Sequence, residues 1–177
     1  MKTGPRGRIR FLLIFILAII LIIYFGRDSL FKKIILKKNE AAIYFVKNGA
    51  LEPVTRTLPT KMTDKEKLNF AISELLKGPE IKEKKAGLTT MIPKNVRLLK
   101  SRLSNNIAEL DFSNQLANYG GGTATVQSLV GQIVYTATEN KEIKKVKFFI
   151  EGKDEEIVLG GEGFVIDRPL GRNDLNL

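Results

Sequence analysis

Three consecutive glycines, Gly120 to Gly122, lead into an apolar segment with helical spacing, an arrangement that could cradle a phosphate. A P-loop needs a lysine and then Ser or Thr at the helix start, so that amides and an ammonium group face the phosphates. Here the glycines are followed by Thr-Ala-Thr, with no lysine between Gly122 and Val126. The spacing of the glycines also fails the dinucleotide fingerprint. We interpret the glycines as a flexible joint with Thr123 or Thr125 as N-cap. Anion binding by free amides at the helix start is the alternative.

Two carboxylates, Glu109 and Asp111, are two residues apart in a segment that alternates like a strand, so they share one face. Paired carboxylates perform acid–base catalysis only in a cleft that raises the pKa of one of them. The pattern therefore favours charges that face solvent. The acidic run 151–156 lacks the Asp-x-Asp-x-Asp-Gly rhythm of a calcium loop, and we interpret it as a solvated hairpin.

The chain has no histidine and no cysteine. Histidine is the commonest general base and metal ligand, so serines such as Ser113 and Ser128 have no imidazole to activate them. The absence of cysteine excludes a disulfide framework and a lipidated N-terminus. These residue types predict a protein that is not an enzyme, with no catalytic residue, no cofactor and no metal site.

The first forty residues differ from the rest. Residues 11–25 are all apolar or aromatic and follow a basic start. As a helix they would be about 22 Å long, against about 30 Å for the hydrocarbon core of a bilayer. We expect a basic cytoplasmic N-terminus at residues 1–10, a transmembrane helix at 11–26 and a basic juxtamembrane linker at 27–40. A cleaved secretory signal is the alternative.

The net charge of +10 is concentrated near this apolar segment: residues 1–40 carry +7 and residues 41–177 carry +3. Anionic lipid head groups attract such a basic flank. A nucleic-acid module would instead carry the excess on its folded face, so we predict no nucleic-acid partner. Basic residues on the two flanks are nearly balanced, and we expect a cytoplasmic N-terminus with the domain outside the cell membrane, the commoner outcome for one N-terminal anchor.

Residues 41–170 are expected to form one domain. Thr63 and Glu66 form a capping-box pair at the start of the clearest helix, and the turn signal at 47–49 joins two strands. The charged tract 82–85 is interpreted as a solvated face. The predicted elements are strands 41–46 and 51–58, a helix at 63–77, a loop at 80–95, strands 96–103 and 107–112, a helix that ends at Ala137, and strand 143–150 with 156–159 pairing back on it. Segment 165–170 closes the domain.

This order is a β-hairpin followed by α-β-β-α-β. Both helices have one apolar stripe each, which suits a single sheet face. The predicted fold class is α+β, with an N-terminal transmembrane helix followed by one two-layer α/β sandwich whose helices lie on one sheet face. Residues 171–177 are expected to form a C-terminal tail.

With its elements placed, residues 41–168 resemble the GerMN family of sporulation and spore-germination domains, through the order and spacing of several short motifs. These include Ile43-Tyr44-Phe45, Leu75-Leu76-Lys77-Gly78-Pro79, Ala108-Glu109-Leu110-Asp111-Phe112-Ser113 and Gln132-Ile133-Val134-Tyr135-Thr136. The motif residues are Tyr44, Phe45, Gly78, Pro79, Leu88, Thr89, Pro93, Asp111, Phe112, Ser113, Gln132, Thr136, Gly152 and Arg168.

The resemblance implies a non-enzymatic domain of the bacterial envelope, similar to ring-building domains of spore-forming and secretion complexes. The expected protein is thus a membrane-anchored extracytoplasmic one that contacts an envelope protein or itself, with sheet edges as the contact. The alternative is a module that binds peptidoglycan. A concave surface lined by Tyr119, Tyr135 and Phe149 would favour that alternative, and use of these rings in the core would oppose it.

Overall fold

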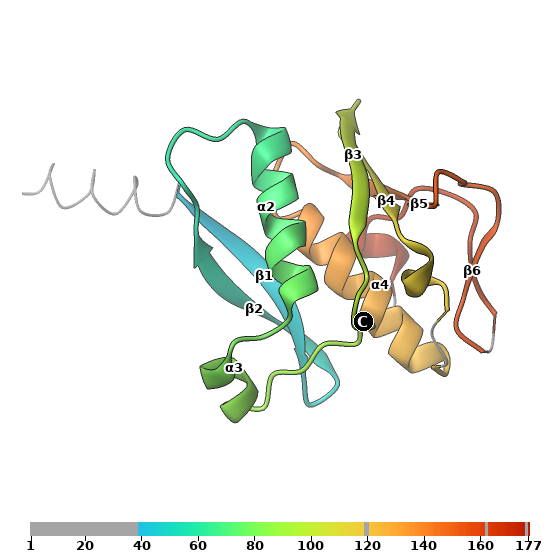
Figure 1. Ribbon diagram of the computed structural model, residues 1–177, viewed down its shortest axis with the longest axis horizontal. Coiled ribbons are helices and arrows are strands. Elements are labelled where there is room, and N and C mark those ends of the chain that lie inside the picture. Colours follow the sequence, from blue (N-terminus) through green and yellow to red (C-terminus); the bar gives the residue numbers. More distant parts are fainter. Residues whose placement is uncertain (1–38, 119–120, 162, 176) are drawn as a thin grey trace, which may run out of the picture. The chain divides into compact units, whose positions relative to one another are not determined.

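The structure, a computed structural model, describes residues 39–118, 121–161, 163–175 and 177 (Figure 1). The transmembrane helix predicted at 11–26 and its flanks at 1–10 and 27–38 lie outside these residues. Within the described part of the chain, no helix combines the length and apolarity needed to cross a bilayer. Residues 41–177 form one compact unit with a mixed α+β fold.

The described domain begins with a hairpin of β1 (Glu40–Lys47) and β2 (Ala50–Thr57). Asn48 and Gly49 between them have φ angles of 52° and 82°. Positive φ at both central residues is what a two-residue hairpin turn requires, and Asn-Gly adopts it at low cost. The predicted turn is confirmed.

Helix α2 (Asp64–Lys77) begins at the predicted cap. The Thr63 backbone N–H donates to the Glu66 carboxylate at 2.7 Å, and the Glu66 N–H donates to Thr63 Oγ1 at 3.3 Å. The charged tract predicted as a solvated loop is instead a short helix, α3 (Ile81–Lys85), in which Glu83 is buried. That prediction is wrong because Glu83 pairs with a buried arginine of β2.

A three-stranded sheet has the order β3–β4–β5, formed by Leu98–Ser104, Ile107–Phe112 and Lys145–Ile150. β3 and β4 are antiparallel, whereas β4 and β5 are parallel and are joined across helix α4 (Thr123–Ala137). Ala108, Leu110 and Phe112 are fully buried on one face of β4, as their alternation predicts. The cap of α4 is Gly122, so the prediction of a threonine cap is wrong.

Two further strands, β6 (Ile157–Leu159) and β7 (Phe164–Ile166), pair with each other in antiparallel fashion. Segment 156–159 therefore does not pair back on β5. Short 3₁₀ helices occupy Asn114–Leu116 and Arg172–Asp174. The residues predicted as a C-terminal tail contact the domain, since Leu175 is buried in the core.

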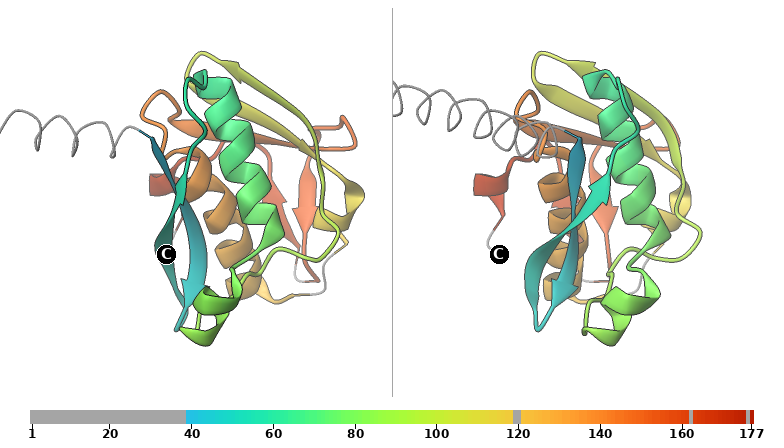
Figure 2. Two further views of the ribbon diagram at one scale, coloured as in Figure 1. Left: turned by 60° about the vertical axis from the view of Figure 1, so that its left-hand side comes forward. Right: turned by 90° about the vertical axis from the view of Figure 1, so that its left-hand side faces the viewer.

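The hairpin does not join the sheet of β3, β4 and β5. In both views of Figure 2, α2 and α4 lie between the hairpin and the strands β3 and β4. The reason lies in α4, which buries residues around most of its circumference, among them Val126, Leu129, Val130, Ile133 and Val134. A helix that is buried on more than one side needs cover on more than one side, and a single sheet face supplies only one.

Candidate functional site

The edge of β1 that faces away from β2 is closed by other segments. The Tyr44 N–H donates to Thr136 Oγ1 at 3.0 Å, and Gln132 Nε2 donates to the Tyr44 carbonyl at 3.1 Å. The next outward-facing residue, Val46, exchanges two backbone hydrogen bonds with Thr89, at 2.9 and 2.8 Å. Side chains from one turn of α4 thus provide the hydrogen-bond partners that a neighbouring strand would supply.

Gln132 connects three segments through one side chain. Its Oε1 accepts a hydrogen bond from the Met91 N–H at 2.8 Å, in addition to the bond that Nε2 donates to Tyr44. Both Gln132 and Thr136 are buried within the core. A buried amide is tolerated only when its donors and acceptors are paired, and here the pairing fixes the spacing between α4, β1 and residues 90–91.

Ser113 has a similar structural role at the end of β4. Its Oγ accepts from the Arg97 N–H at 3.0 Å, and its own N–H donates to the Arg97 carbonyl at 2.9 Å. Ser113 is fully buried, and so is the neighbouring Phe112, whose ring lies 6.2 Å from that of Phe148. The hydroxyl group is therefore used in the fold, as an acceptor for a backbone amide.

The other motif residues also lie at structural positions. Phe45 and Leu88 are in the core, Pro79 is buried and Pro93 half-buried after α2, and Gly78 ends α2 with a φ of 79°. Gly152 is in the turn after β5, where its N–H donates to Asp111 Oδ1 at 3.0 Å. Arg168 is exposed and donates to Asp174 Oδ1 at 2.7 Å, which raises the pKa of its guanidinium.

A cluster at the end of α4 was not found by sequence reasoning. The Arg172 guanidinium lies 4.7 Å from the ring centroid of Tyr135 and 5.4 Å from that of Tyr44. It also donates to Thr138 Oγ1, the Tyr135 carbonyl and the Glu139 carboxylate, at 2.9, 3.1 and 2.8 Å. Burial, together with the hydrogen bond that Tyr44 donates to Glu139, raises the pKa of Tyr44.

A second unpredicted group is a buried ion pair. Arg56 of β2 donates to both carboxylate oxygens of Glu83, at 2.7 and 2.8 Å. Its Nε has no hydrogen-bond partner among the described residues, and it lies 3.4 Å from the Glu74 carboxylate and 3.5 Å from that of Glu80. The hydrogen bonds from Arg56 lower the pKa of Glu83. This pair joins the hairpin to α2 and α3.

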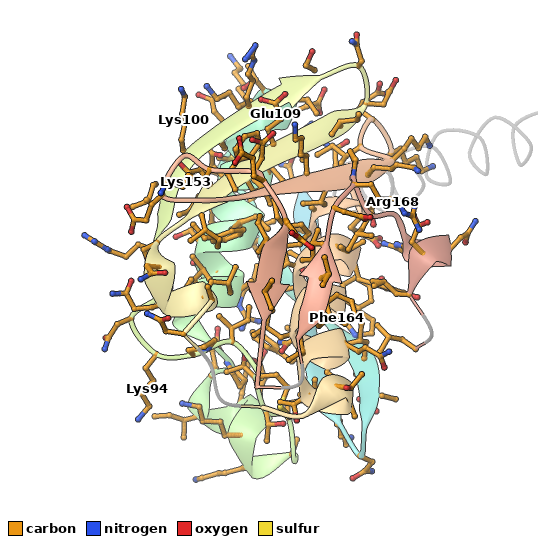
Figure 3. The ribbon with its side chains drawn as sticks, turned by 90° about the vertical axis from the view of Figure 1, so that its right-hand side faces the viewer. Lys94, Lys100, Glu109, Lys153, Phe164 and Arg168 are labelled. Atoms are coloured by element: carbon orange, nitrogen blue, oxygen red, sulfur yellow. The ribbon has the colours of Figure 1, made fainter. Side chains whose placement is uncertain are left out.

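The face of β3, β4 and β5 that points away from the helices carries a pocket of about 220 Å³. Its lining includes the two carboxylates that the sequence placed on one strand face, Glu109 and Asp111, together with Lys100, Arg102, Phe149 and Gly152. Figure 3 shows Lys100, Glu109 and Lys153 at the same end of the molecule, whereas Lys94 lies at the opposite end. Charged side chains surround this pocket, and one aromatic ring lies in its wall.

Two of the three rings proposed for a glycan platform, Tyr135 and Phe149, belong to the described residues, and these two lie in different parts of the domain. Tyr135 packs edge-on against Tyr44 with centroids 5.4 Å apart, whereas Phe149 lines the pocket on the outer sheet face. Tyr119 lies outside the described residues, as does Gly120. Within the described part of the chain, no group of three or more metal-ligating side chains is present.

Comparison with known proteins gives concordant matches. The family model described as Germane, sporulation and spore germination, matches residues 42–156. Over 132 residues, 72% of this chain, the sequence is 31% identical to the spore germination protein GerM of Bacillus subtilis. The match covers 32% of GerM, so the chain spans about a third of that curated relative.

Solved structures agree on the fold. The first GerMN domain of GerM from Bacillus subtilis has a TM-score of 0.56 at 27% identity, covering 76% of this chain and 98% of that one. The tandem GerMN domains of the same protein give 0.59 at 26% identity, covering 77% and 45%. Sequence motifs, family model and fold agree, and the chain belongs to the Germane family of sporulation and spore-germination domains.

Proposed function

We propose that this chain is a single-pass membrane protein that presents its Germane domain outside the cell membrane, where it binds an envelope protein or another copy of itself in a process linked to sporulation or germination. Membership of the Germane family and the similarity to GerM support the link. The apolar segment 11–26 supports the anchor. The proposal also gives the domain a role in binding rather than in catalysis.

The observation that carries this proposal is the contrast between the two faces of the β3–β4–β5 sheet. Helices cover one face, and the motif residues Gln132, Thr136 and Ser113 connect backbone segments inside the domain. On the other face the Arg102 side chain is 66% exposed among the described residues, and a pocket lies between the charged side chains. A scaffold whose motif side chains hold backbone in place, and whose open face is polar, suits a domain that binds.

Contact through side chains of this face is favoured over pairing with a sheet edge. The free edge of β2 contains Pro53, which has no N–H to donate. The free edge of β3 has a bulge between Leu98 and Lys100, and it carries the cations Lys100 and Arg102. Proline, bulges and charges are the features by which proteins prevent strand addition at an edge. We therefore place the contact on the outer sheet face.

Site-specific photo-cross-linking in the native host tests this placement. A photoreactive residue replaces Leu99, which is 42% exposed in the bulge of β3 next to Lys100, and a matched control replaces Ile81, which is 74% exposed on α3. We expect a protein adduct, or a dimer of this chain, from position 99 and not from position 81. No adduct at position 99, or the same adducts from both positions, would refute the proposed contact.

A further inference from the structure

The charges on the outer face of the β3–β4–β5 sheet are arranged in rows of alternating sign. In the strand register, Glu109 of the central strand lies between Arg102 of β3 and Lys147 of β5. Asp111, on the same strand face, lies opposite Lys100. Two carboxylates thus lie along β4, with Lys100 and Arg102 on the β3 side and with Lys147 and Phe149 on the β5 side.

These opposite charges neutralise one another only in part. The Arg102–Glu109 pair is long, at 3.8 Å, and Arg102 is largely exposed. Lys147 is held at 2.6 Å by Asp154 instead of by Glu109. Lys100 forms no ion pair with a described residue, and Asp111 accepts a hydrogen bond from the Gly152 N–H through Oδ1. The cations on the β3 side and carboxylate oxygens of β4 are therefore left to interact with a ligand, and Lys147 can do so in exchange for Asp154.

The pocket between these rows has the size of a side chain. Its volume of about 220 Å³ is below the roughly 300–1,000 Å³ of pockets that hold drug-sized ligands. The turn at Glu151 and Gly152 closes one side, held by the Asp111 carboxylate and by the bond that Glu151 accepts from the Asn114 N–H at 3.0 Å. Phe149 supplies an apolar wall.

A second copy of this face is a poor occupant. A two-fold contact places the same patch of both subunits against itself. Around an axis through the pocket, the Glu109 and Asp111 rows of the two copies would oppose each other, and like charges brought together cost affinity. The complementary ligand has the opposite order of charges, with a cation at its centre and a carboxylate on each side.

We propose that the outer-face pocket receives a basic side chain from a peptide segment of a protein partner, flanked on both sides by acidic residues. Glu109 and Asp111 pair with the inserted cation, and Lys100 and Arg102 pair with the flanking carboxylate on the β3 side, while Lys147 faces the one on the β5 side. This inference rests on the proposed function in placing the contact on this face, and it adds the chemistry of the segment that binds there.

The test uses three short peptides, blocked at both ends, and the purified full chain in detergent. The first is acetyl-Ala-Glu-Lys-Glu-Ala-amide. The second has the same residues in the order Glu-Glu-Lys, and the third, with Lys-Glu-Lys, has each charge reversed in sign. Exposed ion pairs are individually weak, so an affinity of about 1 mM is expected, and nitrogen–proton correlation spectra detect binding in that range. The Gly152 amide, which donates to Asp111, is the reporter, and the Gly78 amide on the far side of the domain is the reference.

The Glu-Lys-Glu peptide should shift the Gly152 resonance and bind about tenfold more tightly than its isomer. Glu109→Lys should abolish this binding and favour the Lys-Glu-Lys peptide, whereas Glu142→Lys, a matched change at an exposed glutamate outside the pocket, should change nothing. Glu109→Gln provides a milder loss if the lysine variant does not fold. No shift at Gly152, or equal binding of the two isomers, would overturn the inference.

The two proposals can fail separately. A cross-linked partner at position 99 without peptide binding at Gly152 would overturn the charge pattern and leave the contact face in place. Binding of the Glu-Lys-Glu peptide without any cross-linked protein would overturn the protein contact and indicate that the pocket takes a free peptide, such as one from the cell wall.

Discussion

Buried polar side chains decide how the segments of this domain fit together. Gln132, Thr136 and Ser113 each satisfy backbone groups of another segment, and Arg56 holds Glu83 within the core. The sequence could name the first three through the family resemblance, because they stand in its motifs. It could not foresee Arg56 and Glu83, since 27 residues separate them and each looks like an ordinary surface charge.

Replacing Gln132 should show how much this side chain stabilises the domain. Gln132→Ala leaves the Met91 N–H and the Tyr44 carbonyl without their partner. Each unsatisfied buried group costs about 1–3 kcal/mol, so we expect a loss of about 2–5 kcal/mol in the free energy of unfolding, measured with urea. Gln127→Ala, on the same helix but not fully buried, is the control. An equal loss in both variants would contradict this role.

The Arg56–Glu83 pair should make stability depend on pH. Arg56 lowers the pKa of Glu83 below its ordinary value of 4.5. Stability from this pair is therefore complete above about pH 4.5, and it is lost as the pH falls through the lower pKa of the folded state. Glu83→Gln should cost about 3 kcal/mol at pH 7, and the difference from the parent chain should shrink in acid.

Urea unfolding at several pH values measures this difference. Asp64, Asp154 and Asp174 also have lowered pKa values, but they remain in both proteins, and their effect cancels in the comparison. A gap between the parent chain and Glu83→Gln that stays constant down to pH 3 would show that the glutamate charge contributes nothing.

At the scale of elements, sequence patterns correctly predicted the features that depend on neighbouring residues. The span of β4, the capping box of α2 and the Asn48–Gly49 turn all agree with the sequence, because each depends on residues close together in the chain. The hairpin was placed in the main sheet, and this was wrong. A backbone carbonyl at its edge accepts a hydrogen bond from Gln132, 88 residues away. The alternation of residues within β1 gives no information about such a distant partner.

The sequence predicted where two residues of the candidate site lie, but as solvent-facing charges and not as a site. Period-two alternation correctly placed Glu109 and Asp111 on one exposed face of β4. Their cationic neighbours Lys100 and Lys147 come from strands that pair with β4 in a register set by the whole sheet. The pocket also depends on the turn at Gly152, which folds back to Asp111. The alternation of residues in β4 alone predicts neither the register of the neighbouring strands nor this turn.

The 3₁₀ helix at Arg172–Asp174 should stabilise the end of α4. Arg172→Ala removes three hydrogen bonds and the stacking on Tyr44 and Tyr135. Because the group is only partly exposed, we expect a loss of about 1–3 kcal/mol. Arg168→Ala, which removes a solvent-exposed ion pair with Asp174, should lower the free energy of unfolding much less than Arg172→Ala does. Equal losses would mean that Arg172 adds only a surface pair.

At the scale of the whole molecule, the domain is built around one helix. α4 is covered by the hairpin, by α2 and by the sheet layer, and α2 and α4 lie between β1–β2 and β3–β4 in Figure 2. The sequence did not predict this, because the large apolar residues of α4 form one stripe, and its other buried positions are Gly131, Gln132 and Thr136. Burial of these positions separates the fold from a two-layer sandwich.

The N-terminal segment should determine where the whole molecule resides. We expect the full chain to sediment with membranes and to stay there in alkaline carbonate, because residues 11–26 are apolar throughout. A variant that lacks residues 1–38 should remain in the supernatant. Mass spectrometry of the purified protein separates an uncleaved anchor from a removed signal peptide. Release of the full chain by carbonate would contradict the anchor.

The closure of β1 by α4 has a consequence for biosynthesis. Tyr44 is synthesised 88 residues before Gln132 and 92 before Thr136, so a nascent chain exposes an open strand edge until most of the domain has emerged. Distant contacts of this kind slow folding, and exposed edges in partly made chains promote aggregation. During synthesis, the hairpin therefore needs a chaperone or rapid completion of the chain, and products that stop before Gln132 should be cleared by proteases.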